Sequence, residues 1–190
     1  MNNTQTEDQT VPSTQTVNSV TAVRQHMTVR SATADDVEAI RTIARDSWEV
    51  DYPEILSRET VDEAVEDWYG KERVTDAIED PLAFLLVAEP AGNTVGFLHG
   101  VLDGETGVIL RLYVHPDHRG QGVGTDLFVA IRREFLDHDV DRIEAMVLAA
   151  NDPGNSFYRH LGMEQVDSGE TLIGGKSFTE HTYELPIETS

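Results

Sequence analysis

The segment Val108-Ile109-Leu110-Arg111-Leu112-Tyr113-Val114 decides the fold, together with Arg119-Gly120-Gln121-Gly122-Val123-Gly124 just after it. The first stretch is apolar and predicts a strand, and the second predicts a short loop that runs into a helix. Glycines at alternate positions let the main chain approach a ligand closely and turn several N–H groups to one side. The helix adds unpaired N–H groups and the positive end of its dipole, so the loop favours an anion such as a pyrophosphate.

Two common phosphate-binding patterns do not describe this loop. A dinucleotide-binding G-x-G-x-x-G would need its third glycine at Thr125, counted from Gly120, or at Leu127, counted from Gly122. A P-loop would need the run Gly-Lys-Ser or Gly-Lys-Thr in this loop, and neither occurs between Arg119 and Thr125.

A second motif, Asn-Asp-Pro-Gly-Asn-Ser-Phe-Tyr-Arg-His-Leu-Gly-Met, lies at Asn151–Met163. The first motif matches R-x-x-G-x-G, the pyrophosphate loop of the GNAT acetyltransferase superfamily, and the second resembles that family's N-x-x-A-x-x-L-Y-x-x-x-G-F. Gly154 stands for the small residue, Phe157 for the leucine and Met163 for the phenylalanine. With both motifs in the family's order, the chain resembles this family over about residues 27–187.

The resemblance implies an α/β protein with the GNAT fold, in which a central mixed, mostly antiparallel, splayed sheet carries helices on both faces. The hydrophobic pattern is consistent with the order β-α-α-β-β-β-α-β-α-β-β. Strands are expected at 27–30, 83–88, 94–102, 108–114, 142–148, 163–167 and 182–187, and a loop at Thr171–Thr179. Residues 1–26 are polar and without a hydrophobic period, which predicts a disordered tail before a single acetyltransferase domain at 27–190.

Composition limits the class of protein. The 190 residues contain no cysteine, which excludes disulfides, thiolate metal sites and a cysteine nucleophile. No apolar run approaches the roughly 20 residues that span a bilayer, and no signal peptide is evident, so we expect a soluble cytoplasmic protein.

The net charge is −21 and the only lysines are Lys71 and Lys176, a pattern that resembles proteins of salt-in halophiles. The absence of a basic stripe argues against nucleic acid as a partner, and the scattered histidines predict no metal site.

By resemblance, the donor would be acetyl-CoA. The main chain around Leu112, Tyr113 and Val114 would pair with its pantetheine arm. The pyrophosphate would bind at a loop made of Arg119, Gly120, Gln121, Gly122, Val123, Gly124 and Thr125. Arg119 either meets a phosphate with its guanidinium or is a solvated surface residue. Asn151 either contacts the pantetheine or only caps a helix.

The resemblance also implies direct transfer of an acetyl group to an amine. Tyr158 occupies the place of the family tyrosine that assists the leaving thiolate, and its alternative role is to pack against the thioester. Many relatives carry a glutamate as general base at the position of Val108. Its substitutes here are Glu105 and His99, or a chain of waters with no single base.

The acceptor would be an amine-bearing small molecule or a protein, such as a protein N-terminus or a lysine side chain. We expect it between the Thr171–Thr179 loop and the segment 48–56, where Trp48 and Tyr52 could bind it. The acidic residues nearby are Glu49, Asp51 and Glu54. These residues could equally form a helix end in an acidic surface.

The edge strands expected late in the chain are consistent with a homodimer. The alternative functions are a non-catalytic acyl-CoA-binding sensor or assembly module and, less strongly, an unrelated domain that binds ATP or NAD.

Overall fold

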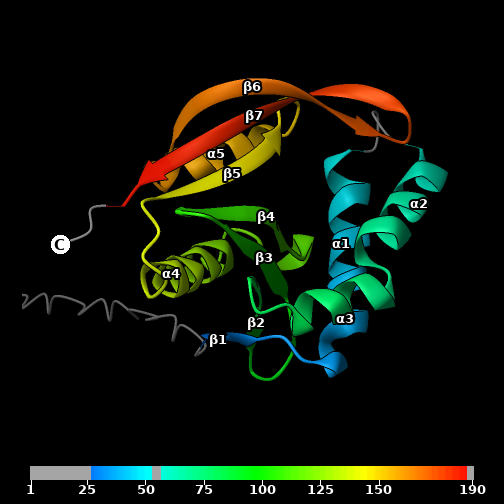
Figure 1. Ribbon diagram of the computed structural model, residues 1–190. Coiled ribbons are helices and arrows are strands. Elements are labelled where there is room, and N and C mark those ends of the chain that lie inside the picture. The colour runs from blue at the N-terminus through cyan, green and yellow to red at the C-terminus, as the bar shows by residue number, and fades with distance from the viewer. Residues whose placement is uncertain (1–26, 53–56, 188–190) are drawn as a thin grey trace, which may run out of the picture.

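The computed structural model describes residues 27–52 and 57–187 (Figure 1). This part of the chain contains seven strands in one sheet. They are β1 (Met27–Ser31), β2 (Ala83–Pro90), β3 (Gly96–Asp103), β4 (Thr106–Val114), β5 (Arg142–Leu148), β6 (Glu164–Ile173) and β7 (Lys176–Pro186). The predicted tail lies outside the described residues, and β1 begins at Met27, where the composition changes.

Five α-helices and two short 3₁₀ helices accompany the sheet in the described residues. The α-helices are α1 (Val37–Asp51), α2 (Arg58–Tyr69), α3 (Lys71–Glu79), α4 (Val123–Leu136) and α5 (Asp152–His160). The 3₁₀ helices are Ala34–Asp36 and Pro116–His118. Ser57 caps α2, since its hydroxyl accepts the Thr60 N–H at 3.2 Å, as its residue type favours. No helix in these residues is long and apolar enough to cross a membrane.

The strand order is β1-β2-β3-β4-β5-β7-β6. Each described neighbouring pair is antiparallel except β4 and β5, which run parallel and are joined by the α4 crossover. The β4–β5 pairing extends only from Thr106 and Arg142 to Ile109 and Ala145. Beyond that point the two strands separate, so the expected mixed, splayed sheet is confirmed.

Helices cover both faces of the sheet, as expected (Figure 1). On one face α1, α2 and α3 enclose a core built around Trp48, Tyr69 and Phe97. On the other face α4 and α5 enclose a second core that includes Phe135 and Tyr183. Because α1 and α5 lie on opposite faces beside the point where β4 leaves β5, residues from both reach the opening between these strands.

The C-terminal hairpin corrects one expectation. Most of the predicted loop Thr171–Thr179 belongs to strands, because β6 continues to Ile173 and β7 begins at Lys176. The turn is Gly174-Gly175, and both glycines have positive φ, 56° and 75°, as a two-residue hairpin turn requires. Nearly all of β6 is exposed, so it lacks the alternation of apolar and polar residues by which strands are recognised.

Candidate active site

A cleft of about 800 Å³ opens where β4 and β5 diverge. The glycine loop and the start of α4 form one end, and the ends of α1 and α2 with the β6–β7 hairpin form the other. The residues at the middle, on the two strands and α5, are Leu110, Leu112, Tyr113, Val114, Met146, Val147, Leu148, Asn151, Pro153, Gly154, Phe157 and Tyr158. Residues of both sequence motifs therefore line the same cleft.

The glycine loop adopts a backbone shape that only glycine takes without strain at two positions. Gly120 has φ of 73° and Gly122 has φ of 89°, and Gly122 is the N-cap of α4. Gly124 lies against the ring of Phe157, where a Cβ atom would come within 3.1 Å of its Cε2. Thr125 and Val123 also line the cleft. The first N–H groups of α4 thus border it, which suits a bound anion.

Gln121 is the one predicted loop residue that does not line the cleft. Its side-chain Nε2 donates instead to the Asp117 carbonyl at 3.2 Å and fixes the loop from outside.

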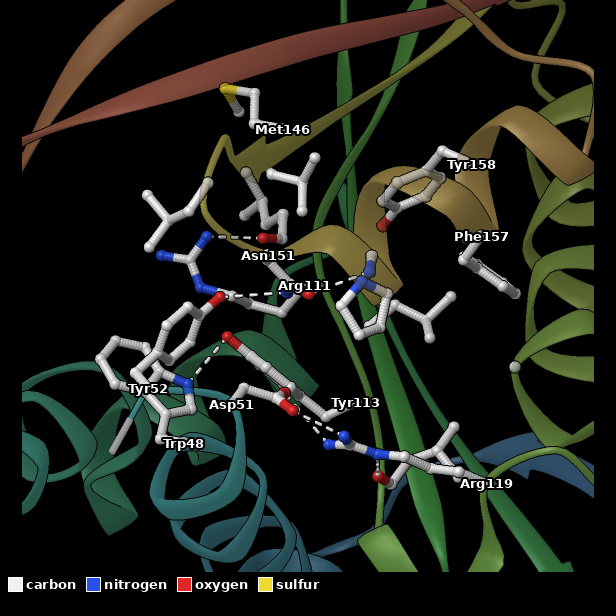
Figure 2. A pocket seen from close by; sticks show the side chains of 18 of the residues that line it. Trp48, Asp51, Tyr52, Arg111, Tyr113, Arg119, Met146, Asn151, Phe157 and Tyr158 are labelled. Atoms are coloured by element: carbon white, nitrogen blue, oxygen red, sulfur yellow. Dashed lines mark hydrogen bonds and ion pairs between the residues drawn. The ribbon is translucent and has the colours of Figure 1, made fainter. Parts of the chain in front are cut away.

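The guanidinium of Arg119 is bound by the protein itself. Its two terminal nitrogens donate to the Asp51 carboxylate at 2.6 and 3.1 Å, as Figure 2 shows. Its Nε donates to the Val114 carbonyl at 3.1 Å. Asp51 is the last residue of α1, so this ion pair ties α1 to the glycine loop. Two roles were expected for Arg119: a phosphate ligand or a solvated surface residue. Neither role describes this arrangement, because the guanidinium is bound by Asp51 and Val114.

The edge of β4 presents main-chain groups to the cleft. The His115 N–H donates to Val95 on the β3 side, so by strand alternation the main-chain groups of Leu112 and Val114 face the other way, toward β5. β5 does not pair with β4 at these residues. The Val114 carbonyl is taken by Arg119, whereas Leu112 has no β5 partner. Leu110 is an extra residue in β4, because His99 pairs with Arg111 and Gly100 pairs with Ile109.

Tyr158 reaches the cleft from α5, and its hydroxyl points into the opening (Figure 2). The side chain is 6% exposed and its ring stacks on Tyr183, with ring centroids 5.9 Å apart. Burial raises the pKa of Tyr158 above its usual value, so the phenol is protonated at neutral pH.

Asn151 is both a helix cap and a link across the cleft. Its side-chain oxygen accepts the Gly154 N–H at 2.9 Å, and its Nδ2 donates to the Tyr52 hydroxyl at 3.0 Å. Tyr52 lies directly after α1, and burial raises the pKa of its hydroxyl. The amide thus joins α5 to the end of α1.

The end of the cleft where the acceptor was expected, near the end of α1, has aromatic walls. The described acidic side chains near it, Asp51 and Glu49, already lie beside arginines. Trp48 is 2% exposed and donates from Nε1 to the Tyr113 hydroxyl at 2.9 Å. Asp51 binds Arg119, Glu49 lies 3.7 Å from Arg58, and Glu54 is outside the described residues. Trp48 and Tyr52 therefore form a wall of this end rather than an open aromatic cage.

Neither predicted general base lines the cleft. Glu105 is exposed in the turn between β3 and β4, at the end of β4 where β4 still pairs with β5. His99 borders a separate small cavity under Trp68 and Tyr69, and its Nε2 is buried without a hydrogen-bond partner among the described residues. Burial lowers the pKa of His99. Their placement therefore argues against both as bases, because neither can touch an acceptor in the cleft.

Two charged residues of the cleft were missed by the sequence interpretation. Arg111 lines it on β4 and lies over the Trp68 ring, with Cζ 4.4 Å from the ring centroid. Glu180 lines it on β7 and lies within the predicted strand gap between 167 and 182. Arg111 stood in the predicted strand and could have been noted as a cation in an apolar run. Glu180 carried no local signal, because the β5–β7 pairing brings it to the cleft.

Comparison with known proteins identifies the class of protein. The model of the acetyltransferase (GNAT) family matches residues 37–163, and the chain belongs to this family. An acetyltransferase from Sodalis glossinidius is 39% identical over 101 residues, which is 53% of this chain and 69% of that protein. A spermidine N(1)-acetyltransferase from Thermoplasma acidophilum is 25% identical over 155 residues, covering 79% of this chain and 96% of that one.

Solved structures agree on the fold. A PaiA N-acetyltransferase from Thermoplasma acidophilum, solved in complex with coenzyme A, has a TM-score of 0.76 at 22% identity, over 85% of this chain and 99% of that one. The ribosomal-protein-S18-alanine N-acetyltransferase from Escherichia coli has a TM-score of 0.67 at 15% identity, over 87% and 96%. The protein is accordingly an acetyl-CoA-dependent N-acetyltransferase with the GNAT fold.

Proposed function

We propose that this chain transfers an acetyl group from acetyl-CoA to a primary amine by direct attack of the amine in a ternary complex. The observation that carries this proposal is the cleft itself, in which a glycine loop, an unpaired β4 edge and the Tyr158 hydroxyl surround the same opening. Bound acetyl-CoA would supply an activated acetyl group as a thioester.

The donor half of the site follows from the shape of the loop. The N–H groups at the start of α4 would hold the pyrophosphate, and the main chain of Leu112 would hold the pantetheine arm. Arg119 would act on the donor through the loop, because its guanidinium is bound to Asp51. Asn151 would keep α5 and the end of α1 at a fixed separation while both contact the ligand.

Tyr158 would act at the leaving sulfur. A protonated phenol can donate a hydrogen bond to a sulfur that gains negative charge. The pKa of Tyr158 is raised above about 10, whereas the ordinary pKa of a thiol is about 8.5, so proton transfer from the phenol to the thiolate is uphill. We therefore propose that Tyr158 stabilises the leaving thiolate by a hydrogen bond and does not fully transfer its proton.

The acceptor would enter beneath the β6–β7 hairpin. Thr171 and Ile173 of β6 line this end together with Trp68 and Glu180, so the space lies between the hairpin and the helices. The candidate acceptors are a protein N-terminus, a lysine side chain and a small amine. The T. acidophilum relative is named for spermidine, which makes spermidine a reasonable first probe for this chain.

The test is release of coenzyme A from acetyl-CoA with three acceptors: spermidine, a peptide with a free N-terminal alanine and an N-blocked peptide with one lysine. Because the acidic composition predicts adaptation to salt, each assay is run in dilute and in molar KCl. We expect amine-dependent release and an acetylated product by mass spectrometry. Tight binding of acetyl-CoA with no acetylated amine would instead favour the non-catalytic binding module.

A further inference from the structure

Two carboxylates line the cleft among the described residues, and they differ in what they contact. Asp51 is held by both terminal nitrogens of Arg119. The side chain of Glu180 makes no hydrogen bond or ion pair with any residue that the structure describes. We propose that Glu180 is the general base of the reaction and takes a proton from the ammonium group of the acceptor. This inference rests on the proposed function above.

The place of Glu180 in the sheet leaves room for an acceptor beside it. On β7 it pairs with Leu148 of β5 on one side and Gly169 of β6 on the other. Neither neighbour offers a polar side chain, and a Cβ atom at Gly169 would meet nothing within 4 Å. Glu180 is half-buried, so it faces the cleft with a path to solvent still open. A base needs both features: contact with the reacting amine and an exit for the proton.

Burial and a neighbouring positive charge act on the Glu180 carboxyl in opposite directions. Burial raises the pKa of its carboxyl, and the positive charge of Arg111 on β4 acts in the opposite direction. Arg111 therefore keeps the carboxylate available although it is partly desolvated. A base whose pKa is raised toward the working pH accepts a proton more effectively than an ordinary glutamate.

No other titratable group that lines the described cleft fits this role. The hydroxyls of Tyr52, Tyr113 and Tyr158 are protonated at neutral pH, because burial raises the pKa of each. His118 lies in the 3₁₀ helix beside the glycine loop, at the donor end. Asp51 is committed to Arg119. The neighbours of Glu180 across both strand pairs, Leu148 and Gly169, do not titrate.

The proton balance of the transfer is complete with Glu180 in this role. The acceptor ammonium gives one proton to the Glu180 carboxylate, and the neutral nitrogen bonds to the acetyl carbon while the carbon–sulfur bond breaks. The nitrogen loses its second proton as the sulfur gains one, beside the Tyr158 hydroxyl. Glu180 then releases its proton to solvent. Overall the ammonium and the thioester become an amide, a thiol and one free proton.

The test compares the pH dependence of kcat/KM for Glu180→Gln, Glu180→Asp and the wild type in the full chain, at saturating acetyl-CoA. The acceptor is the amine of the three-member panel that the wild type acetylates fastest. Glu184→Gln is the matched control, because Glu184 lies on the same face of β7 four residues on, outside the cleft, 3.5 Å from Arg142. An unchanged rise of the unfolding midpoint with acetyl-CoA shows that each variant folds and binds the donor.

Loss of a general base should lower kcat/KM about 100-fold at pH 7 in Glu180→Gln. The deficit should shrink as pH approaches about 10, where an alkylamine begins to lose its proton unaided. Glu180→Asp should retain part of the rate, and Glu184→Gln should match the wild type. A deficit of equal size at every pH, or none, would overturn the inference and leave the proposed function standing. If the wild type acetylates none of the amines, the proposed function fails and the inference fails with it.

Discussion

Asp51 binds both terminal nitrogens of Arg119, and this ion pair joins the last residue of α1 to the loop that precedes α4. The two residues are 68 positions apart in the sequence, and both line the cleft. Asp51 is 11% exposed at its side chain and Arg119 is 33% exposed. Loop position and helix position are therefore coupled through one partly buried interaction.

Replacing Arg119 by methionine should destabilise the protein because it leaves the Asp51 carboxylate buried without its partner. We expect the free energy of unfolding to fall by about 1–3 kcal/mol, less than for a fully buried pair because Arg119 is partly exposed. Chemical denaturation of Arg119→Met, Asp51→Asn and the double variant measures the coupling. A coupling near zero together with complete loss of acetyl-CoA binding would show that the guanidinium serves the ligand and not Asp51.

Alanine substitutions at Gly120 and Gly92 can separate two effects of an added Cβ atom: strain in the backbone and steric exclusion of the ligand. Their φ angles are 73° and 87°, and a Cβ atom at either would meet no protein atom within 4 Å. Alanine at each position should cost a similar, small amount of stability, on the order of 1 kcal/mol, because both residues are left-handed. Only Gly120 lines the cleft, so only Gly120→Ala should weaken acetyl-CoA binding, by about tenfold or more by calorimetry. Equal effects on binding would refute the placement of the donor.

Tyr158→Phe should lower kcat with little change in acetyl-CoA affinity, because the phenol contributes a hydrogen bond that strengthens as the sulfur leaves. Removal of one such donor costs about 100-fold in kcat. Tyr183→Phe is the control, since that hydroxyl donates to the Asn155 side-chain oxygen at 2.9 Å and does not line the cleft. It should lower stability by about 1 kcal/mol and leave kcat nearly unchanged. Full activity in Tyr158→Phe would reduce Tyr158 to a packing residue.

Asp36 should make the stability depend on pH in the acid range. The Arg30 guanidinium, with Nη1 2.7 Å from the carboxylate, holds the pKa of Asp36 at about 2 against an ordinary 3.8. Because the folded pKa is lowered, the contribution is complete above about pH 4 and disappears as pH falls through about 2. Asp36→Asn should therefore lose about 2 kcal/mol at pH 7, and the difference from wild type should vanish near pH 2. Denaturation curves of both proteins across this range test it, and a difference in stability that stays the same at every pH would contradict it.

The parts of the site that could be predicted were those encoded locally. The glycine loop shows itself because positive φ at Gly120 and Gly122 demands glycine, and the loop adjoins its strand and helix in sequence. Asn151 and Tyr158 belong to one short motif on one helix. The strands β4 and β5 were bounded closely for the same reason: apolar residues mark buried strands.

Pairings between distant segments could not be read in the same way. Glu180 reaches the cleft because β7 pairs with β5 at Leu148, 32 residues earlier, and nothing near Glu180 signals that register. Arg119 binds Asp51, which lies 68 residues earlier in the chain, and only the fold brings these two residues together. Glu105 and His99, the bases predicted from the sequence, do not line the cleft, for the converse reason. They are close to β4 in sequence, but one lies in a turn and the other faces the helical core.

The most direct test of the central claim, that the cleft between β4 and β5 holds acetyl-CoA, is thermal unfolding in molar KCl with acetyl-CoA, ATP or NAD. At a hundredfold excess over its dissociation constant, a ligand that binds only the folded protein adds about 2.7 kcal/mol. We predict a clear rise of the midpoint with acetyl-CoA alone, much reduced in Gly120→Ala and preserved in Gly92→Ala. No rise with acetyl-CoA, or an equal rise with ATP or NAD, would contradict the account.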